Sequence, residues 1–371
     1  MQSVRRWALM GVVAAGMLLG GSRQASAQAT ADDPLAFFRT VNFSGLVDTY
    51  YTYNFNEPRT RTLTPLRNFD VRHNQFSLAL VELALDKGAT TDHRVGFRFD
   101  LDYGQVAQFF SGDPLDGDAA MNVQQAYIRF LAPIGRGLTL EAGKFVTPIG
   151  TEVTESPLNN NYSRSFLYAL GPYYHVGARV SYPFSDAVTL SGMVVNGWNA
   201  TGDNNAARSY GVTATITPTK AVSIVQNLLV GPEQNNDTDD VRTVSDTGLT
   251  VTLGGGRSTG LNYMYAKDSA GTRDLQWQGL ALYYREPVTS VFAVAPRFEI
   301  FKDRDAFVTG SRQTLKEFTL TGELKHAQGL VFRAEYRRDW SDRNYFSKRS
   351  LPINNQNTFT TSVVVSFDSK R

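Results

Sequence analysis

The sequence of 371 residues contains no cysteine at all. Disulfide bonds, thiolate chemistry, cysteine-zinc sites and a lipid anchor on an N-terminal cysteine are therefore excluded. Only four histidines are present, with no metal-ligand spacing and no nucleophile motif such as G-x-S-x-G. After the first 27 residues, no apolar run approaches the roughly 20 residues that a membrane-spanning helix needs.

The first 27 residues have the pattern of a secretory signal peptide. An Arg-Arg pair at residues 5–6 precedes an apolar stretch at residues 7–20, and Ala-Ser-Ala follows at residues 25–27. About 14 apolar residues are too few for a membrane anchor, so we predict cleavage before Gln28. The arginine pair also fits a twin-arginine signal. A chain that must cross the inner membrane unfolded favours the general secretory route.

The charge of the remaining chain is close to balanced. Of 37 basic residues three lie in the predicted signal peptide, which leaves 34 bases against 35 acids. This balance gives no support to nucleic-acid binding. A mean hydropathy of −0.27 is typical of a soluble protein, but a polar-lined barrel gives the same average. The 17 Tyr and 23 Phe favour a barrel, because barrels place aromatic girdles at both membrane surfaces.

Apolar and charged side chains alternate strictly in residues 330–339. On a β-strand this alternation places the two kinds of side chain on opposite faces. An arginine that faces lipid near the bilayer midplane costs about 2 to 4 kcal/mol. We therefore predict that the charged face lines the lumen of a barrel and that the apolar face contacts lipid.

About sixteen segments of this kind, each of roughly ten residues, follow one another from residue 41 to residue 367, joined alternately by short turns and long polar loops. The pattern predicts an all-β, transmembrane, antiparallel up-and-down β-barrel with short periplasmic turns and long extracellular loops. Residues 28–40 are predicted to form a short periplasmic segment and residues 368–371 a periplasmic tail. The second segment, residues 74–87, is apolar on both faces. The register of this segment is left open. A local bulge or a partner that packs inside the barrel would explain why both of its faces are apolar.

A barrel of about sixteen strands leaves an aqueous lumen, whereas eight strands would be filled by side chains. Acids and bases alternate on the predicted lumen face, where they either set a transverse field or pair along the wall. Pairing is the favoured interpretation, because buried charges need partners. Seven bases against five acids hint at anion preference, unless Glu141, Glu317 and Glu323 also face inward. The predicted pore-lining residues are Arg94, Arg98, Asp100, Asp102, Gln125, Tyr127, Arg129, Arg179, Arg297, Glu299, Arg333, Glu335, Arg337 and Asp339.

The long connection of residues 147–173 is the candidate constriction loop. Its length and position would allow it to fold inward and narrow the lumen, and an ordinary surface loop is the alternative interpretation. The polar residues expected to act in the constriction are Glu152, Glu155, Asn160, Tyr162 and Arg164.

An enzyme is disfavoured on this scaffold. A pair of His175 and Glu155 is imaginable, but a polar lumen histidine is the commoner outcome. The predicted function is passive diffusion of small hydrophilic solutes or ions, with no cofactor and no metal. A non-conducting structural or adhesive barrel is the alternative, and a barrel enzyme is a less favoured one.

Several stretches resemble one family of outer-membrane proteins. They are VQQAYIRFLAPIGRG at residues 123–137, GKFVTPIG at residues 143–150, NYSRS at residues 161–165, GPYYH at residues 171–175 and VNGWN at residues 195–199. On these stretches the chain resembles the putative β-barrel porin 2 family along nearly all of its mature length. The resemblance implies a porin-like protein in the outer membrane of a Gram-negative-type bacterium, with no catalytic residues and an undefined solute.

The last segment, residues 357–367, alternates and ends on an aromatic residue, as an insertion signal for the barrel assembly machinery does. Besides that machinery, the expected partners are outer-membrane lipid and small hydrophilic solutes, with no nucleic acid. The solute, gating and association into a homotrimer stay open at this point.

Overall fold

The computed structural model describes residues 39–58, 63–110 and 121–370. The chain divides into two units, residues Met1–Thr40 and Val41–Arg371, and nearly all described residues belong to the second unit. The predicted signal peptide and most of the predicted periplasmic segment lie outside the described residues. Within the described part of the chain, no helix is long and apolar enough to cross a membrane.

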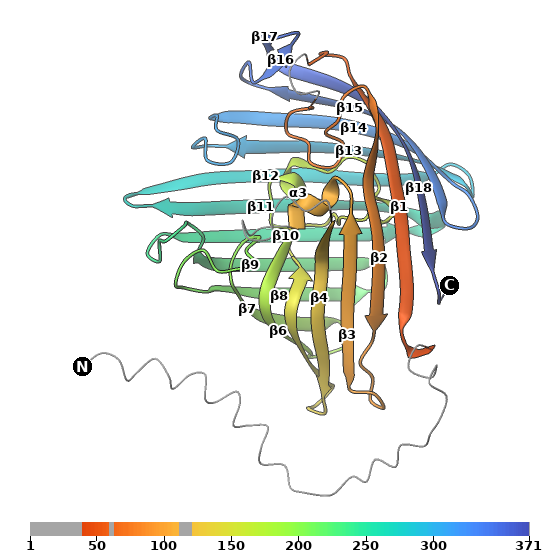
Figure 1. Ribbon diagram of the computed structural model, residues 1–371, viewed down its shortest axis with the longest axis vertical. Coiled ribbons are helices and arrows are strands. Elements are labelled where there is room, and N and C mark those ends of the chain that lie inside the picture. Colours follow the sequence, from red (N-terminus) through yellow and green to blue (C-terminus); the bar gives the residue numbers. More distant parts are fainter. Residues whose placement is uncertain (1–38, 59–62, 111–120, 371) are drawn as a thin grey trace, which may run out of the picture. The chain divides into compact units, whose positions relative to one another are not determined.

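Sixteen strands of the described residues close into an antiparallel barrel, in which each strand pairs with its neighbours along the chain (Figure 1). The barrel closes where the last strand pairs with the first. These two observations confirm the predicted fold class. The barrel strands are β1 (Asn42–Asn54), β2 (Gln75–Lys87), β3 (Val95–Tyr103), β4 (Met121–Ala132), β5 (Leu138–Val146), β6 (Tyr174–Pro183), β7 (Val188–Val195), β8 (Ser209–Thr219), β9 (Val222–Pro232), β10 (Val241–Leu253), β11 (Arg257–Ala270), β12 (Arg273–Pro287), β13 (Phe292–Asp303), β14 (Gln313–Lys325), β15 (Leu330–Ser341) and β18 (Asn355–Asp368).

Strand β15 shows why the alternating sequence forms a barrel wall. Arg333 and Arg337 are 3% and 1% exposed and face inward, whereas Phe332 and Tyr336 are 40% and 39% exposed and face outward. The same alternation holds in β1, where Asp48 is buried inside. Burying the charged face within the barrel avoids the cost of a cation in lipid.

Strand β2 combines both explanations offered for its apolar faces. The pairing of β1 with β2 shifts register between Asp48 and Thr49, which leaves Ala79 as the extra residue of a bulge. Leu80 then faces inward, where it is 1% exposed and packs in a cluster with Tyr50 and Tyr162. Leu83 remains on the outer face, 43% exposed.

The turn between β14 and β15 requires a glycine. Gly329 has a φ of +77°, and a Cβ added there would lie 1.9 Å from the backbone oxygen of Ser366 on β18. The neighbouring strand therefore approaches too closely for any side chain at this position.

The chain past Phe367 continues the barrel further than the sequence indicated. Asp368 still pairs with Ser44 on β1, and the Ser369 amide donates to the Phe43 carbonyl at 2.9 Å. The first residues of the predicted tail therefore belong to the pairing at the seam between β18 and β1.

Short helices and one extra hairpin lie in the connections between the barrel strands, all but one of them in long connections. They are η1 (Val106–Phe110), η3 (Ser156–Leu158), α3 (Phe166–Ala169), a two-stranded sheet of β16 (Phe346–Lys348) and β17 (Leu351–Ile353), and, in a short turn, η4 (Gly254–Gly256). Helix α3 contacts β12 and β13 (Figure 1). Its first amides bond to an inward-facing carboxylate of β13. The connection that contains α3 therefore lies inside the barrel.

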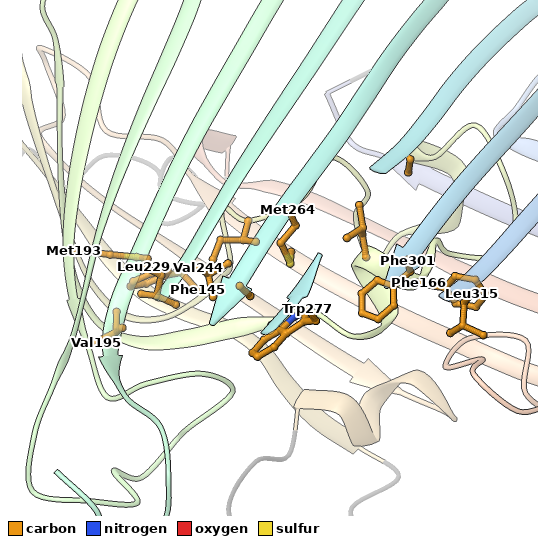
Figure 2. Close-up of a cluster of buried hydrophobic side chains, with 14 of the residues drawn as sticks. Phe145, Phe166, Met193, Val195, Leu229, Val244, Met264, Trp277, Phe301 and Leu315 are labelled. Atoms are coloured by element: carbon orange, nitrogen blue, oxygen red, sulfur yellow. The ribbon is translucent and has the colours of Figure 1, made fainter. Parts of the chain in front are cut away.

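The apolar core also lies inside the barrel, near the long-loop ends of the strands. Inward side chains from successive strands form a band on which loop residues such as Phe166 pack (Figure 2). The Phe166 and Phe301 rings lie 6.5 Å apart. The labelled members of the band are Phe145, Phe166, Met193, Val195, Leu229, Val244, Met264, Trp277, Phe301 and Leu315.

Candidate functional site

Two carboxylates of the barrel wall hold the backbone of the connection at residues 147–173. Glu335 on β15 accepts from the amides of Tyr162 at 2.6 Å and Ser163 at 3.0 Å. Glu299 on β13 accepts from the amides of Phe166 at 2.6 Å and Leu167 at 2.8 Å. The second pair satisfies amides at the start of α3, which have no partner within the helix.

Arg297 joins the same connection to two strands. Its guanidinium pairs with Glu152 of the loop at 2.8 Å and with Glu317 of β14 at 2.7 Å. It also donates to the Ser163 carbonyl at 2.6 Å. Arg297 is 1% exposed, so each of its charged contacts lies away from water. A buried cation with two carboxylate partners is strongly disrupted when one partner is removed.

Two further arginines of β15 bind loop carbonyls. Arg333 donates to the Ser156 carbonyl at 2.6 Å and pairs with Glu323 at 2.6 Å. Arg337 donates to the Arg164 carbonyl at 2.5 Å and pairs with Asp339 at 2.7 Å. The six residues predicted on β13 and β15 thus lie together, facing inward, and are buried beneath the loop.

Contacts on other strands show how far the connection extends. The Tyr162 hydroxyl donates to Asp48 of β1 at 3.0 Å, and Ser156 donates to the same carboxylate at 2.6 Å. The Gly150 amide donates to Asp246 of β10 at 2.9 Å. Because β10 and β1 lie almost opposite each other around the barrel, the connection crosses the lumen.

Among the predicted loop residues, Arg164 supports the loop from within. It donates to the carbonyls of Val153 at 2.9 Å and Thr154 at 2.5 Å, and its guanidinium lies 4.6 Å from the Phe69 ring centre. Asn160 is only half-buried. Glu155 is also half-buried and accepts from Gln124 at 3.2 Å.

Burial raises the pKa of three tyrosines of this region, Tyr162, Tyr168 and Tyr173. Their phenols therefore stay protonated and remain hydrogen-bond donors. Tyr168 shares a hydrogen bond of 2.8 Å with Thr154, and Tyr173 donates to the Ala169 carbonyl at 2.8 Å. The bond between Tyr168 and Thr154 joins the end of the connection to its beginning, and the bond from Tyr173 stabilises the end itself.

Two other long connections also enter the barrel, which the sequence did not indicate. Arg67, from the connection after β1, pairs with Asp339 at 3.0 Å and with Asp70 at 3.0 Å. Phe110 of η1 is fully buried, and its carbonyl accepts from Lys144 at 2.5 Å. Aromatic residues are no more frequent in residues 55–74 and 104–120 than in the chain as a whole, so composition did not indicate that these connections enter the barrel.

A cavity of about 1130 Å³ extends from the loop to the short-turn end of the barrel. Ser44, Gly329 and Asp368 mark its turn end, and loop residues form its opposite boundary. The predicted residues that line it are Arg98, Gln125, Tyr127, Arg179, Glu152 and Glu155.

Three arginines present partly exposed guanidiniums on this side of the barrel. Two of their acidic partners lie deeper, and the third, Asp86, is 34% exposed and lies 3.6 Å from Arg129. The Arg98 side chain is 31% exposed and pairs at 2.8 Å with Asp100, which is fully buried. Arg129 and Arg179 are each 23% exposed and share Glu141, at 2.9 Å and 2.6 Å, which is 7% exposed. The charge that water meets here is therefore mainly positive.

The remaining predicted residues also lie on inward faces. Arg94 donates to the Leu131 carbonyl at 3.1 Å near the turn end, and Asp102 is fully buried opposite Glu82. Glu141, Glu317 and Glu323 are 7%, 0% and 2% exposed and each pairs with an inward arginine. These three acids offset the excess of bases counted from the sequence.

His175 is a structural residue in this arrangement. It is fully buried, with Nδ1 2.9 Å from the Gly197 carbonyl and Nε2 3.0 Å from the Thr147 hydroxyl. In the described residues, no hydrogen bond or ion pair joins His175 to Glu155. The imagined pair is therefore not formed, since both imidazole nitrogens are already occupied.

Residues 40–367 match a family described as "Putative beta-barrel porin-2, OmpL-like". The chain belongs to this family. Family and fold together identify it as an outer-membrane porin-type channel, as the resemblance of residues 123–150 implied.

Solved porin structures share the barrel fold at low sequence identity. An anion-selective porin from Comamonas acidovorans has a TM-score of 0.61 and 12% identity, over 88% of this chain and 99% of that one. OmpT, an outer membrane protein of Vibrio cholerae in its trimer form, gives 0.59 and 12%, with the same coverage. The outer membrane channel DcaP of Acinetobacter baumannii gives 0.58 and 11%, over 88% and 97%. No curated protein matches the chain.

Proposed function

We propose that the chain lets small hydrophilic solutes and ions diffuse passively across the outer membrane, with residues 147–173 as a fixed constriction. One observation carries the proposal: the loop is fixed across the lumen by buried charges and leaves a cavity of about 1130 Å³ lined by charged side chains. A solute that enters from the turn end meets polar and charged groups as far as the loop.

The predicted pore-lining residues divide into two roles in this proposal. The six on β13 and β15 are buried beneath the loop, so they hold the constriction and do not contact solute. Arg98 and Arg179 line the cavity, Arg129 shares Glu141 with Arg179 beside it, and these three set the field with Glu155 on the loop. Because the exposed charge is mainly cationic, we expect a weak preference for anions.

The assembly proposals rest on sequence and fold. The signal-peptide pattern of residues 1–27 supports export by the general secretory route with cleavage before Gln28. The alternation of residues 357–367 supports insertion by the barrel assembly machinery. The short turns, residues 28–40 and the C-terminus would then face the periplasm, and the long loops would face outside. Association into a homotrimer is supported by the trimer form of OmpT from Vibrio cholerae.

Liposome swelling with sugars of increasing size tests the diffusion proposal. We expect swelling that falls steeply with solute size, because the loop sets a fixed opening. A specific observation favours a second candidate, a non-conducting structural or adhesive barrel: three long connections enter the lumen and bury its charges. Correctly inserted protein that gives no swelling with any solute would favour this closed barrel.

A further inference from the structure

Four basic residues lie close together on the outer, lipid-facing side of the barrel. Lys302 is near the end of β13 and Arg304 directly follows that strand, Lys316 is near the start of β14, and Arg338 is near the end of β15. Three of them are exposed and Lys316 is half-exposed. We call these four residues the rim patch. All lie at the long-loop ends of their strands.

Strand register places the patch residues within reach of one ligand. Thr314 lies opposite Lys302, and Trp340 lies opposite Lys316. Lys316 is therefore the diagonal neighbour of Lys302, and Arg338 is the diagonal neighbour of Lys316. Diagonal neighbours on one face are about 7 to 8 Å apart. Long basic side chains can converge across that distance on a single anionic group.

Two acids lie near the rim patch, and both are engaged elsewhere: Asp305 accepts from the Gln276 amide at 3.0 Å and lies 3.6 Å from Arg312, and Asp342 accepts from the Thr314 amide at 2.9 Å. Among the described residues, none of the four forms an ion pair; Arg304 donates to the neutral Gln276 at 3.0 Å. Other rim cations are neutralised, since Lys267 pairs with Asp274 at 3.1 Å and Arg208 pairs with Asp203. Four neighbouring cations without ion-pair partners repel one another, and an external anion bound at the patch would relieve that repulsion.

A pocket of about 170 Å³ adjoins the patch on its β12 side. Lys302 and Arg304 line it together with Tyr265, Gln276 and Gln278. Guanidinium, ammonium and amide groups are the donors that phosphate oxygens accept from. The outward side chains on the membrane side of the patch, Ile300, Phe318 and Leu320, are apolar.

We propose that the rim patch binds the phosphate group of a lipid of the outer leaflet, with the acyl chains along the apolar wall below it. Basic side chains near the end of a strand reach the headgroup level at little cost, because their long stems extend along the apolar wall. The cations then neutralise the phosphate, and the aromatic pair Phe298 and Trp340, 6.4 Å apart, lies beside it. The site requires no open lumen, so it stands independently of the diffusion proposal.

Binding to mixed micelles that contain a diphosphorylated glycolipid tests the site, with the dephosphorylated glycolipid and inorganic phosphate as separate arms. Each cation near a membrane surface contributes about fivefold to binding of an anionic lipid. The quadruple variant K302Q/R304Q/K316Q/R338Q should therefore bind the phosphorylated lipid more than about 100-fold more weakly. Wild-type binding should also weaken as salt increases.

The matched control removes paired rim cations with K267Q/R208Q, and it should bind as the wild type does. The four patch residues face outward without ion-pair partners, so the quadruple variant should keep the heat-modifiable gel mobility of a folded barrel. Equal binding by the quadruple variant and the wild type would overturn the proposal. So would equal binding of the phosphorylated and dephosphorylated lipids. Binding of inorganic phosphate as tight as that of the lipid would show a free-anion site instead, which would also overturn it.

Discussion

Replacing the two carboxylates that hold the constriction loop, Glu299→Ala and Glu335→Ala together, should release the loop from the barrel wall. The wild-type carboxylates accept hydrogen bonds of 2.6 to 3.0 Å from four loop amides, those of Tyr162, Ser163, Phe166 and Leu167. The strand ladders do not depend on these side chains. The barrel should therefore stay folded while the loop loses its attachment.

The expected loss can be worked from those four bonds. A hydrogen bond to a charged group contributes about 1.5 to 3 kcal/mol net, so four bonds contribute about 6 to 12 kcal/mol to the seated loop. Arg297 and Arg333 still contact loop carbonyls in the variant. Arg297, however, loses two nearby buried carboxylates, Glu299 and Glu335. The seated conformation should then become a minor one.

Single-channel conductance and limited proteolysis measure the release. The double variant should conduct more than the wild type and should be cut within residues 147–173, where the wild type resists. The matched control E57A/E286A removes two exposed carboxylates whose ion pairs are at the surface, and it should change neither property. A folded double variant with wild-type conductance and an uncut loop would refute the assignment of these carboxylates.

Three further predictions concern the barrel and its connections. Burial lowers the pKa of His73, whose Nδ1 accepts from the Asn54 amide at 2.9 Å. The folded state therefore favours the neutral ring. The stabilisation that the neutral ring contributes is present above the ordinary histidine pKa of about 6.5 and is lost as the pH falls below it. Hydrogen-exchange protection of that amide should decrease from pH 7 to pH 5 in the wild type and stay constant in H73Q; constancy in both would contradict the reasoning. Leu80→Ala should lower the free energy of unfolding, measured by urea denaturation, by about 2 to 5 kcal/mol, because Leu80 is buried inside the barrel. Leu83→Ala, on the outer face, is the control, and equal effects of the two substitutions would contradict the inward position of Leu80. Deleting residues 368–371 removes both hydrogen bonds between Ser369 and Phe43, at 2.9 and 3.0 Å, so it should lower stability by about 2 kcal/mol without preventing insertion; an unchanged unfolding midpoint would show that this end of the seam contributes nothing.

The barrel could be predicted because its lipid and lumen faces require opposite side chains. Residues 330–339 alternate so strictly that only one register buries the charges, and all of them lie in β15, Leu330–Ser341. In β2 the alternation failed where an inward cluster replaces water around Leu80. Local periodicity reports the polarity of the two faces, so it cannot distinguish an apolar lumen from lipid.

The position of the long connections depends on contacts between residues far apart in the sequence. Glu335 and Tyr162 are separated by 173 positions, and no local pattern indicates that the carboxylate meets that amide. The sequence therefore placed Arg297 and Arg337 on the inward face but left open whether water or the loop would cover them. The rim patch was equally hidden, because its residues converge only through the pairing of β13, β14 and β15.

Single-channel recording across a salt gradient tests the central claim most directly, namely that the barrel is a channel narrowed by its own loop. We predict discrete conductance steps and a reversal potential of the sign expected for weak anion preference. Replacing Arg98, Arg129 and Arg179 with Gln should shift that potential towards cations. Absence of any conductance in well-inserted, correctly folded protein would contradict the account.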